Sequence, residues 1–350
     1  MSTVSAPSRR LFLGTAALGL TAATAQLALA STPHAQSAPA SVGAQRALAS
    51  FGPLRQIDAG LLNVGFVDVG PSDGRVVILL HGWPYDIHSF ADVAPRLVAA
   101  GFRVIVPHLR GHGSTRFLSP ATLRNGQQAA VALDIVALMD ALDIRKATFG
   151  AFDWGARTAD IIAAMFPERC EGLVSVSGYL INNREAVKAP LPPAAEYAWW
   201  YQFYFATEHG KAGYARNRHD FNKLIWKTAS PRWDFSDAEF ERSAASFDNP
   251  DHVDVVIHNY RWRQSLAEGE ARYDDLERQL AAGPAICVPS IVMEGDANGA
   301  PHFTGDAAFR RKFTGPYAYR VVAGGIGHNL PQEAPREFAQ AVIDVAALRL

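Results

Sequence analysis

The chain has 350 residues, of which 49% are hydrophobic and 19% are charged, and its formal net charge is −1. This composition suits a globular protein with a large core. Because positive and negative charges are balanced, the composition does not indicate nucleic-acid binding. The two cysteines, Cys170 and Cys287, lie far apart and form neither a CxxC motif nor a metal-ligand cluster. We therefore expect both to be small core residues.

The first 30 residues have the pattern of an export signal. Arg9 and Arg10 lie in the segment SRRLFLG, which is typical of twin-arginine signals, and a weakly apolar run follows. An A-x-A cleavage site ends at Ala30, and residues 31–48, rich in Ala, Ser and Pro, read as a linker. Because the apolar run contains threonines and a glutamine, it is a poor membrane anchor. We expect a periplasmic or secreted protein whose mature chain has no membrane anchor.

Beyond residue 48, segments typical of buried strands alternate with segments typical of helices. Continuous apolar runs predict parallel strands, and apolar spacings of three and four residues predict helices. The expected strands are 61–69, 75–80, 103–107, 147–150, 172–177, 289–294 and 319–322, the first of them exposed. The expected helices are 89–100, 126–142, 158–166 and 333–348. This order predicts a doubly wound α/β fold with a mostly parallel sheet.

The alternation stops between residues 180 and 275, where the chain is aromatic and helical. Helices are expected there at 197–205, 214–227, 237–246 and 251–262, with no run typical of a parallel strand. We interpret 180–275 as a helical cap inserted between later strands of the sheet. The core is then formed by residues 49–179 and 276–350.

A nucleophile is predicted in the segment TFGAFDWGA (148–156). A short apolar strand, a small-x-Asp-x-small sequence and a helix start follow one another there, which is the pattern of a nucleophile elbow with Asp153 at its tip. Ester and amide hydrolysis usually use serine or cysteine at such a turn. A carboxylate instead displaces at an electrophilic carbon, and water then hydrolyses the alkyl ester. Asp153 therefore indicates the opening of an epoxide or a carbon–halogen bond, unless it is an ordinary helix N-cap.

Two loops supply the expected partners of Asp153. His81-Gly82-Trp83-Pro84 follows the strand 75–80, so the backbone N–H groups of Trp83 and Trp154 are the expected oxyanion donors. His328 lies in a glycine-containing loop after the last strand and is the expected base. Its position agrees with the chain order nucleophile, acid, histidine.

The acid that orients His328 is harder to place. Such an acid often lies three residues after the glycine that ends the strand 289–294, but Asn298 occupies that position. Asp296, two residues earlier, is our choice. Asn298 acting through hydrogen bonding alone, or an acid after the strand 172–177, remains open; a neutral orienting group would stabilise the imidazolium less.

These segments resemble the α/β-hydrolase-fold epoxide hydrolases between residues 50 and 345. HGWP (81–84), Asp-Trp-Gly (153–155) and GHNLPQEAP (327–335) carry the resemblance. Haloalkane and fluoroacetate dehalogenases share all three segments, so these motifs do not separate the families. The resemblance implies an α/β-hydrolase fold with an inserted helical cap.

The cap distinguishes the two chemistries. Tyr-Gln-Phe-Tyr-Phe (201–205) resembles the cap segment of epoxide hydrolases whose first tyrosine is an acid catalyst, which implies that role for Tyr201. The segment HNYRW (258–262) is similar to the one that brings a second tyrosine, here Tyr260. Two phenols aimed at the epoxide oxygen would hold and protonate the alkoxide. Either tyrosine could instead serve only to pack the cap, since aromatic residues are abundant there.

The sequence therefore predicts an epoxide hydrolase that takes a small-molecule epoxide and water and needs no metal or organic cofactor. The alternatives are a haloalkane or haloacid dehalogenase, with Trp154 donating to the halide, and a non-catalytic ligand-binding protein that kept the pocket. Neither the substrate nor the oligomeric state follows from the sequence.

Overall fold

The computed structural model describes residues 51–300 and 305–350, which belong to one compact unit, Leu48–Leu350. The predicted export signal and linker lie outside the described residues. Among the helices of the described part, none has both the length and the apolar character needed to cross a membrane.

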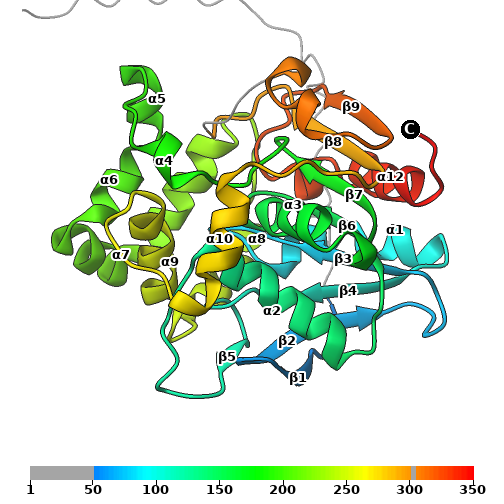
Figure 1. The fold of residues 1–350 in the computed structure, drawn as a ribbon, viewed down its shortest axis with the longest axis horizontal. Helices are drawn as coiled ribbons and strands as arrows, with labels where there is room; N and C mark the ends of the chain where they lie inside the picture. The colour runs from blue at the N-terminus through cyan, green and yellow to red at the C-terminus, as the bar shows by residue number, and fades with distance from the viewer. Residues whose placement is uncertain (1–50, 301–304) are drawn as a thin grey trace, which may run out of the picture. The chain divides into compact units, whose positions relative to one another are not determined.

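A nine-stranded sheet runs through the described part of the chain in the order β1-β2-β4-β3-β6-β7-β8-β9, with β5 paired to β2 (Figure 1). The pairs that involve β1, β2 and β5 are antiparallel, and the others are parallel. The strands are β1 (Arg55–Ala59), β2 (Leu62–Val69), β3 (Val76–Leu80), β4 (Arg103–Pro107), β5 (Arg116–Phe117), β6 (Ala147–Ala151), β7 (Cys170–Val176), β8 (Ser290–Gly295) and β9 (Tyr317–Val322). The predicted mostly parallel, doubly wound sheet is confirmed.

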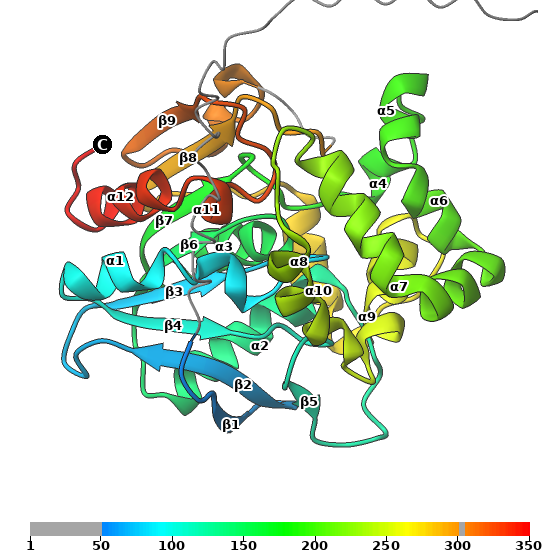
Figure 2. The same ribbon diagram turned by 180° about the vertical axis from the view of Figure 1, so that it is seen from behind.

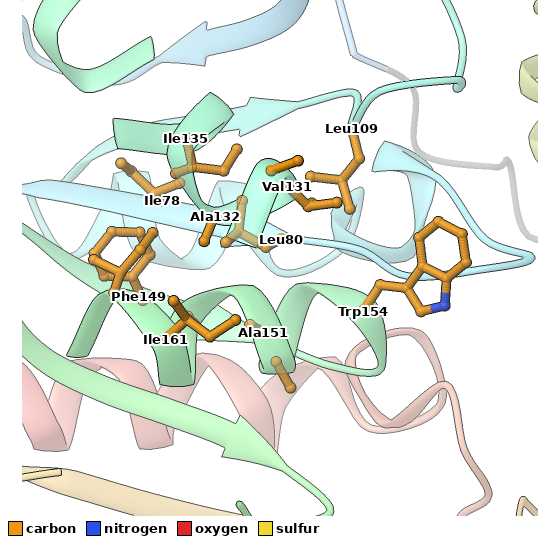
Figure 3. Close-up of a cluster of buried hydrophobic side chains, with 14 of the residues drawn as sticks. Ile78, Leu80, Leu109, Val131, Ala132, Ile135, Phe149, Ala151, Trp154 and Ile161 are labelled. Atoms are coloured by element: carbon orange, nitrogen blue, oxygen red, sulfur yellow. The ribbon is translucent and has the colours of Figure 1, made fainter. Parts of the chain in front are cut away.

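Helices cover both faces of this sheet (Figures 1 and 2). On one face lie α2 (Gln128–Ala141) and α3 (Trp154–Met165), and on the other lie α1 (Ala94–Ala99), α11 (Leu330–Glu333) and α12 (Pro335–Ala346). Strand β3 is buried on both sides because Ile78 and Leu80 belong to the first hydrophobic cluster and Val77 and Leu79 to the second. Figure 3 shows part of the first cluster, which extends along α2 and α3 to Trp154, the residue that follows Asp153.

The chain between β7 and β8 is helical, as predicted. Its helices are α4 (Arg184–Val187), α5 (Pro193–Ala198), α6 (Trp200–Ala206), α7 (Glu208–Ala229), α8 (Asp237–Ala244), α9 (His252–Arg263) and α10 (Asp274–Ala281). Helix α7 carries a kink at Asn217, whose backbone angles are not helical. Helices α6, α7 and α9 pack on one another and form the part of the cap that matters for the site.

Several details differ from the sequence-based expectation. Strand β2 is mostly buried rather than exposed, because β1, β5 and β4 flank it. The helix expected at 89–100 is split into a 3-10 turn at Ile87–Phe90 and α1. Cys170 is buried, as predicted, but the prediction for Cys287 was wrong, because this residue is exposed in the irregular segment before β8.

Candidate active site

The turn between β6 and α3 presents Asp153 at its tip. The φ of Asp153 is +53°, in the left-handed region that non-glycine residues rarely adopt, so the surrounding packing must hold this strained backbone. That packing is tight: a Cβ added at Gly155 would stand 2.1 Å from the carbonyl oxygen of Leu80 in β3. Helix α3 starts at Trp154, directly after the turn, rather than at 158 as the apolar spacing predicts.

The two carboxylate oxygens of Asp153 have different surroundings. Oδ1 accepts the backbone N–H of Trp83 at 2.8 Å, and Oδ2 lies 3.4 Å from Nε2 of His328. Burial raises the pKa of Asp153, but His328, Arg157 and the Trp154 amide together outweigh it and hold this pKa below its ordinary value. Asp153 is therefore ionised at neutral pH, with one oxygen bound by an oxyanion-type amide and the other facing the histidine.

His328 is held by its loop rather than by a partner on its ring. Its backbone N–H donates to Ser230 Oγ at 2.9 Å, and Ser230 in turn donates to Glu333 Oε1 at 2.7 Å. Glu333 Oε2 accepts the N–H of Gly327 at 2.6 Å. Within residues 51–300 and 305–350, Nδ1 of His328 has no hydrogen-bond partner. The sequence analysis did not predict the contacts of Ser230 and Glu333. Only Glu333 lies in a recognisable motif, the GHNLPQEAP segment.

The structure does not bring Asp296 to the His328 ring. Its carboxylate accepts the backbone N–H groups of Gly324, Gly325 and Ile326 at 2.8–3.0 Å, and these amides lower its pKa. Asp296 thus fastens the loop that leads to His328.

The other residues considered for the orienting role do not reach the ring either. Asn298 Nδ2 donates to Ser177 Oγ at 3.1 Å, and its Oδ1 accepts the N–H of Ala300. Directly after β7 the chain continues with Ser177 and Gly178, neither of which is an acid. Both loop positions that could face the histidine therefore carry neutral groups that bind each other.

Tyr201 of α6 and Tyr260 of α9 come together over Trp83 of the HGWP loop. Their ring centroids are 5.4 Å apart, and both rings pack on the indole of Trp83, at 5.5 Å and 5.2 Å. Burial, with the nearby charge of Asp153, raises the pKa of Tyr201 to about 12 and that of Tyr260 further above its usual value. Both phenols therefore keep their protons at neutral pH and can donate them.

The hydroxyl of Tyr214 in α7 connects three separate parts of the chain. It accepts the indole N–H of Trp83 at 2.8 Å, donates to Asn222 Oδ1 at 3.1 Å and lies 2.9 Å from Nε2 of His252 in α9. This buried network positions the Trp83 side chain under the cap tyrosines.

Buried histidines pack beneath this network. The ring of His112 lies 5.0 Å from that of His81 and 4.8 Å from that of His252. Burial lowers the pKa of each of these rings, and the pKa of His112 falls to about 4, as does that of the neighbouring His108. Neutral imidazoles are potential metal ligands, yet no group of three or more His, Cys, Asp or Glu in the described residues is arranged to hold a metal ion.

The fold and this site define a class of protein. The family model described as alpha/beta hydrolase fold matches residues 75–284, and the chain belongs to that family. As a member of this family, the protein is a hydrolase.

Particular relatives narrow the comparison. The chain is 24% identical to epoxide hydrolase A of Mycobacterium tuberculosis over 317 residues, which cover 83% of this chain and 96% of that protein. A crystal structure of a provisionally assigned epoxide hydrolase from Klebsiella pneumoniae is 60% identical, with a TM-score of 0.83 over 84% of this chain and 97% of that one. A haloalkane dehalogenase of Mycolicibacterium paratuberculosis is 30% identical, over only 41% of this chain and 45% of that protein.

Proposed function

We propose that this protein is an epoxide hydrolase that converts an epoxide and water into a vicinal diol through an ester on Asp153. The observation that carries the proposal is the placement of Tyr201 and Tyr260, which face each other over the loop whose amide binds the nucleophile. Relatives at full or nearly full length that are named epoxide hydrolases support it.

In the first step, Oδ2 of Asp153 attacks one epoxide carbon. The carbon–oxygen bond of the ring breaks as the ester bond forms, and the released oxygen takes a proton from one of the two phenols. A phenol is suited to this because its raised pKa keeps the proton on the oxygen until the alkoxide, a stronger base, appears.

In the second step, water attacks the ester carbonyl carbon of Asp153. His328 takes a proton from that water, and the tetrahedral oxyanion forms at the oxygen that the Trp83 amide already binds. The Trp154 amide, which lowers the pKa of Asp153, is the second donor. When this intermediate collapses, the leaving oxygen takes the proton that His328 holds, and the diol is released. The carboxylic acid formed on Asp153 then returns a proton to the phenolate, which restores both the carboxylate and the phenol.

The dehalogenase alternative requires N–H donors around a leaving halide. The indole N–H of Trp83 is already donated to Tyr214, so it does not face a halide in this arrangement. Among the two tryptophans of the site, only Trp154 keeps an indole N–H without a partner within the described residues. One such donor with two phenols above the nucleophile favours epoxide opening.

The decisive experiment is a panel of epoxides and haloalkanes given to the protein from residue 31 onward, with detection of diol and halide. A single turnover in H₂¹⁸O tests whether an ester forms on Asp153. Hydrolysis of that ester places the label in the enzyme carboxylate and leaves the first diol unlabelled. Halide release without diol would replace the proposal by the dehalogenase. No turnover of any substrate would favour the ligand-binding alternative.

We also propose that the protein is exported by the twin-arginine route, on the strength of Arg9, Arg10 and the A-x-A site that ends at Ala30. Replacing both arginines with lysine should leave the precursor inside the cell, detectable by fractionation and intact mass. Export of that variant at the normal level would reject the route. A mature protein that begins at Met1 would reject the signal.

A further inference from the structure

Asn298, in the loop that follows β8, lies between the two segments that hold His328. The N–H of the residue before Asn298 donates to the carbonyl of Ile326, two positions before the histidine, at 2.8 Å. The N–H of the residue after Asn298 donates to the carbonyl of Ala229, also at 2.8 Å. The neighbour of Ala229 is Ser230, whose hydroxyl accepts the His328 N–H. The backbone on each side of Asn298 is therefore bonded to the surroundings of the histidine.

The histidine lacks the negative charge that its role requires. Nδ1 of His328 is buried and has no hydrogen-bond partner in the described part of the chain. In the hydrolytic step the ring becomes a cation, and a neutral orienting group stabilises this cation less than a carboxylate does. Asn298 and Ser177 are both neutral and bind each other at 3.1 Å. An acid at position 298 would stand where the sequence pattern of such a triad expects it.

Asn298 is followed by glycine, and in this pair an asparagine side chain loses its amide most readily. The backbone nitrogen of Gly299, which no side chain shields, attacks the side-chain carbonyl carbon of Asn298, and ammonia leaves as a cyclic imide forms. One water then opens the imide to aspartate or isoaspartate, so no other reactant is needed. Packing fixes the glycine, because a Cβ there would stand 2.2 Å from the carbonyl oxygen of Thr228. Gly299 is also exposed, so water reaches the pair.

The contacts of the Asn298 side chain assist this reaction. Oδ1 accepts the N–H of Ala300 at 3.0 Å, which stabilises the negative charge that develops on this oxygen as the ring closes. Nδ2 lies 3.1 Å from the hydroxyl oxygen of Ser177, which can pass a proton to the departing nitrogen. A carboxylate keeps both contacts, because it accepts from an amide and from a hydroxyl. The Gly299 N–H must first leave the carbonyl of Ala229, so we expect a reaction over days rather than hours.

We propose that Asn298 deamidates spontaneously and that the aspartate formed at position 298 orients His328 during ester hydrolysis. The protein thereby completes its own catalytic site after it has folded, without an enzyme or a cofactor. The effect on the rate rests on the proposed epoxide hydrolase function, whereas the modification itself does not.

A second Asn-Gly pair in the chain, Asn125-Gly126, is an internal control. It has a similar local arrangement, because Asn125 Oδ1 accepts the N–H of Gln127, two residues later, at 2.9 Å. Asn125 and Gly126 are both buried, however, and Asn125 Nδ2 donates to Glu270 at 2.6 Å. Because the water that opens the imide does not reach this pair, we expect Asn125 to remain an asparagine.

Mass spectrometry of peptides from fresh protein and from protein aged in mildly alkaline buffer tests the modification. The peptide that contains Asn298 should gain the mass difference between an amide and an acid and separate into aspartate and isoaspartate forms. The peptide that contains Asn125 should stay unchanged, as should position 298 in Asn298→Gln, whose longer side chain closes the ring far more slowly. Conversion of Asn298 no faster than that of Asn125 over several weeks would overturn the inference.

Asn298→Asp supplies the acid directly and tests its role. In single turnovers, this variant should hydrolyse the ester on Asp153 faster than fresh wild-type protein by about 10²–10⁴-fold, with ester formation unchanged. Aged wild-type protein should show a fast phase whose amplitude follows its aspartate fraction. Equal rates of ester hydrolysis in Asn298→Asp and fresh wild-type protein would overturn the inference and leave the epoxide hydrolase intact.

A measurement that needs no substrate separates this inference from the proposed function. A carboxylate bound to Nδ1 of His328 should give a downfield proton NMR signal for that nitrogen in Asn298→Asp, and Asn298→Gln should lack it. If no substrate forms an ester with any of these proteins, the proposed function fails. In that case the mass spectra and this signal still decide the inference: both present would support it, and the lack of either would overturn it.

Discussion

Gly82 lies directly against Asp153: a Cβ at this position would stand 2.1 Å from Oδ1 of Asp153. The contact explains why the loop that supplies the Trp83 amide can approach the carboxylate to hydrogen-bond distance. The methyl group of Gly82→Ala must push either the loop or Asp153 away. We expect a loss of at least about 10²-fold in the rate of ester formation, measured in single turnovers, because displacements near 1 Å have this effect. Gly52→Ala, where a Cβ meets nothing within 4 Å, is the control and should react normally.

His328→Gln should accumulate the ester. Attack by Asp153 needs the carboxylate and the phenols, whereas hydrolysis needs the base that lies 3.4 Å from Oδ2. Intact mass should rise by one substrate, and the added mass should map to the peptide that contains Asp153. A variant that turns over at the wild-type rate without adduct would remove His328 from the mechanism.

Tyr201→Phe and Tyr260→Phe should each slow ester formation, and the double variant should nearly abolish it. Acid assistance is worth about 10²–10⁴-fold, and loss of one phenol costs less while the other still holds the oxygen. Rapid-quench measurement of the ester on a neutral epoxide is the readout. Tyr197→Phe is the matched control, because Tyr197 lies in the same cap and is 81% exposed. Wild-type rates in both single variants would favour the dehalogenase.

Asp296→Asn tests whether that residue orients His328 or only its loop. The carboxylate accepts three backbone N–H groups through two oxygens, whereas an amide has one acceptor oxygen. We expect a loss below about 10²-fold in ester hydrolysis, from a loosened loop, with ester formation less affected. A loss of about 10³-fold or more in hydrolysis alone would mean that Asp296 reaches the imidazolium in the ester state. Asn298→Ala, measured in parallel, tests the neutral group paired with Ser177.

The buried histidines should make the protein sensitive to acid. The folded-state pKa values of His108 and His112 are depressed to about 4, so between pH 6.5 and 4 the unfolded chain binds more protons. The contribution of these two rings is therefore complete above pH 6.5 and falls as the pH drops, by about 1.4 kcal/mol per pH unit for each ring. Urea unfolding between pH 7.5 and 4.5 measures this slope. His112→Gln should flatten it, and His219→Gln, an exposed histidine whose pKa is raised, should not.

The parts of the fold with a strong local pattern were predictable from the sequence. The parallel strands read as apolar runs because both of their faces are buried, and the elbow read clearly because its geometry requires small residues around Asp153. Strand β1 and the burial of β2 were missed, since antiparallel strands at the start of the sheet depend on which neighbours cover them. Helix α3 was placed late because its first turn is fixed by the elbow and not by apolar spacing.

Within the candidate site, too, some residues could be predicted from the sequence and others could not. Asp153, His328 and the two tyrosines could be identified because motifs of adjacent residues mark them. The role of Asp296 could not be settled from spacing, because the direction of a loop side chain depends on backbone amides, here those of residues 324–326, that only the folded chain brings together. Ser230 supports the His328 loop from the end of α7, and no local pattern indicates a contact across 98 residues.

The shared hydroxyl of Tyr214 limits how this protein could be re-engineered. Trp83 in the core, Asn222 in α7 and His252 in α9 all meet at that single oxygen. A chimera that received the whole helical segment from another hydrolase would leave the Trp83 indole without its acceptor, directly beneath the reacting centre. Transplants that alter selectivity therefore have to carry the tyrosine, the amide and the imidazole as one set, or exchange the HGWP loop together with the cap.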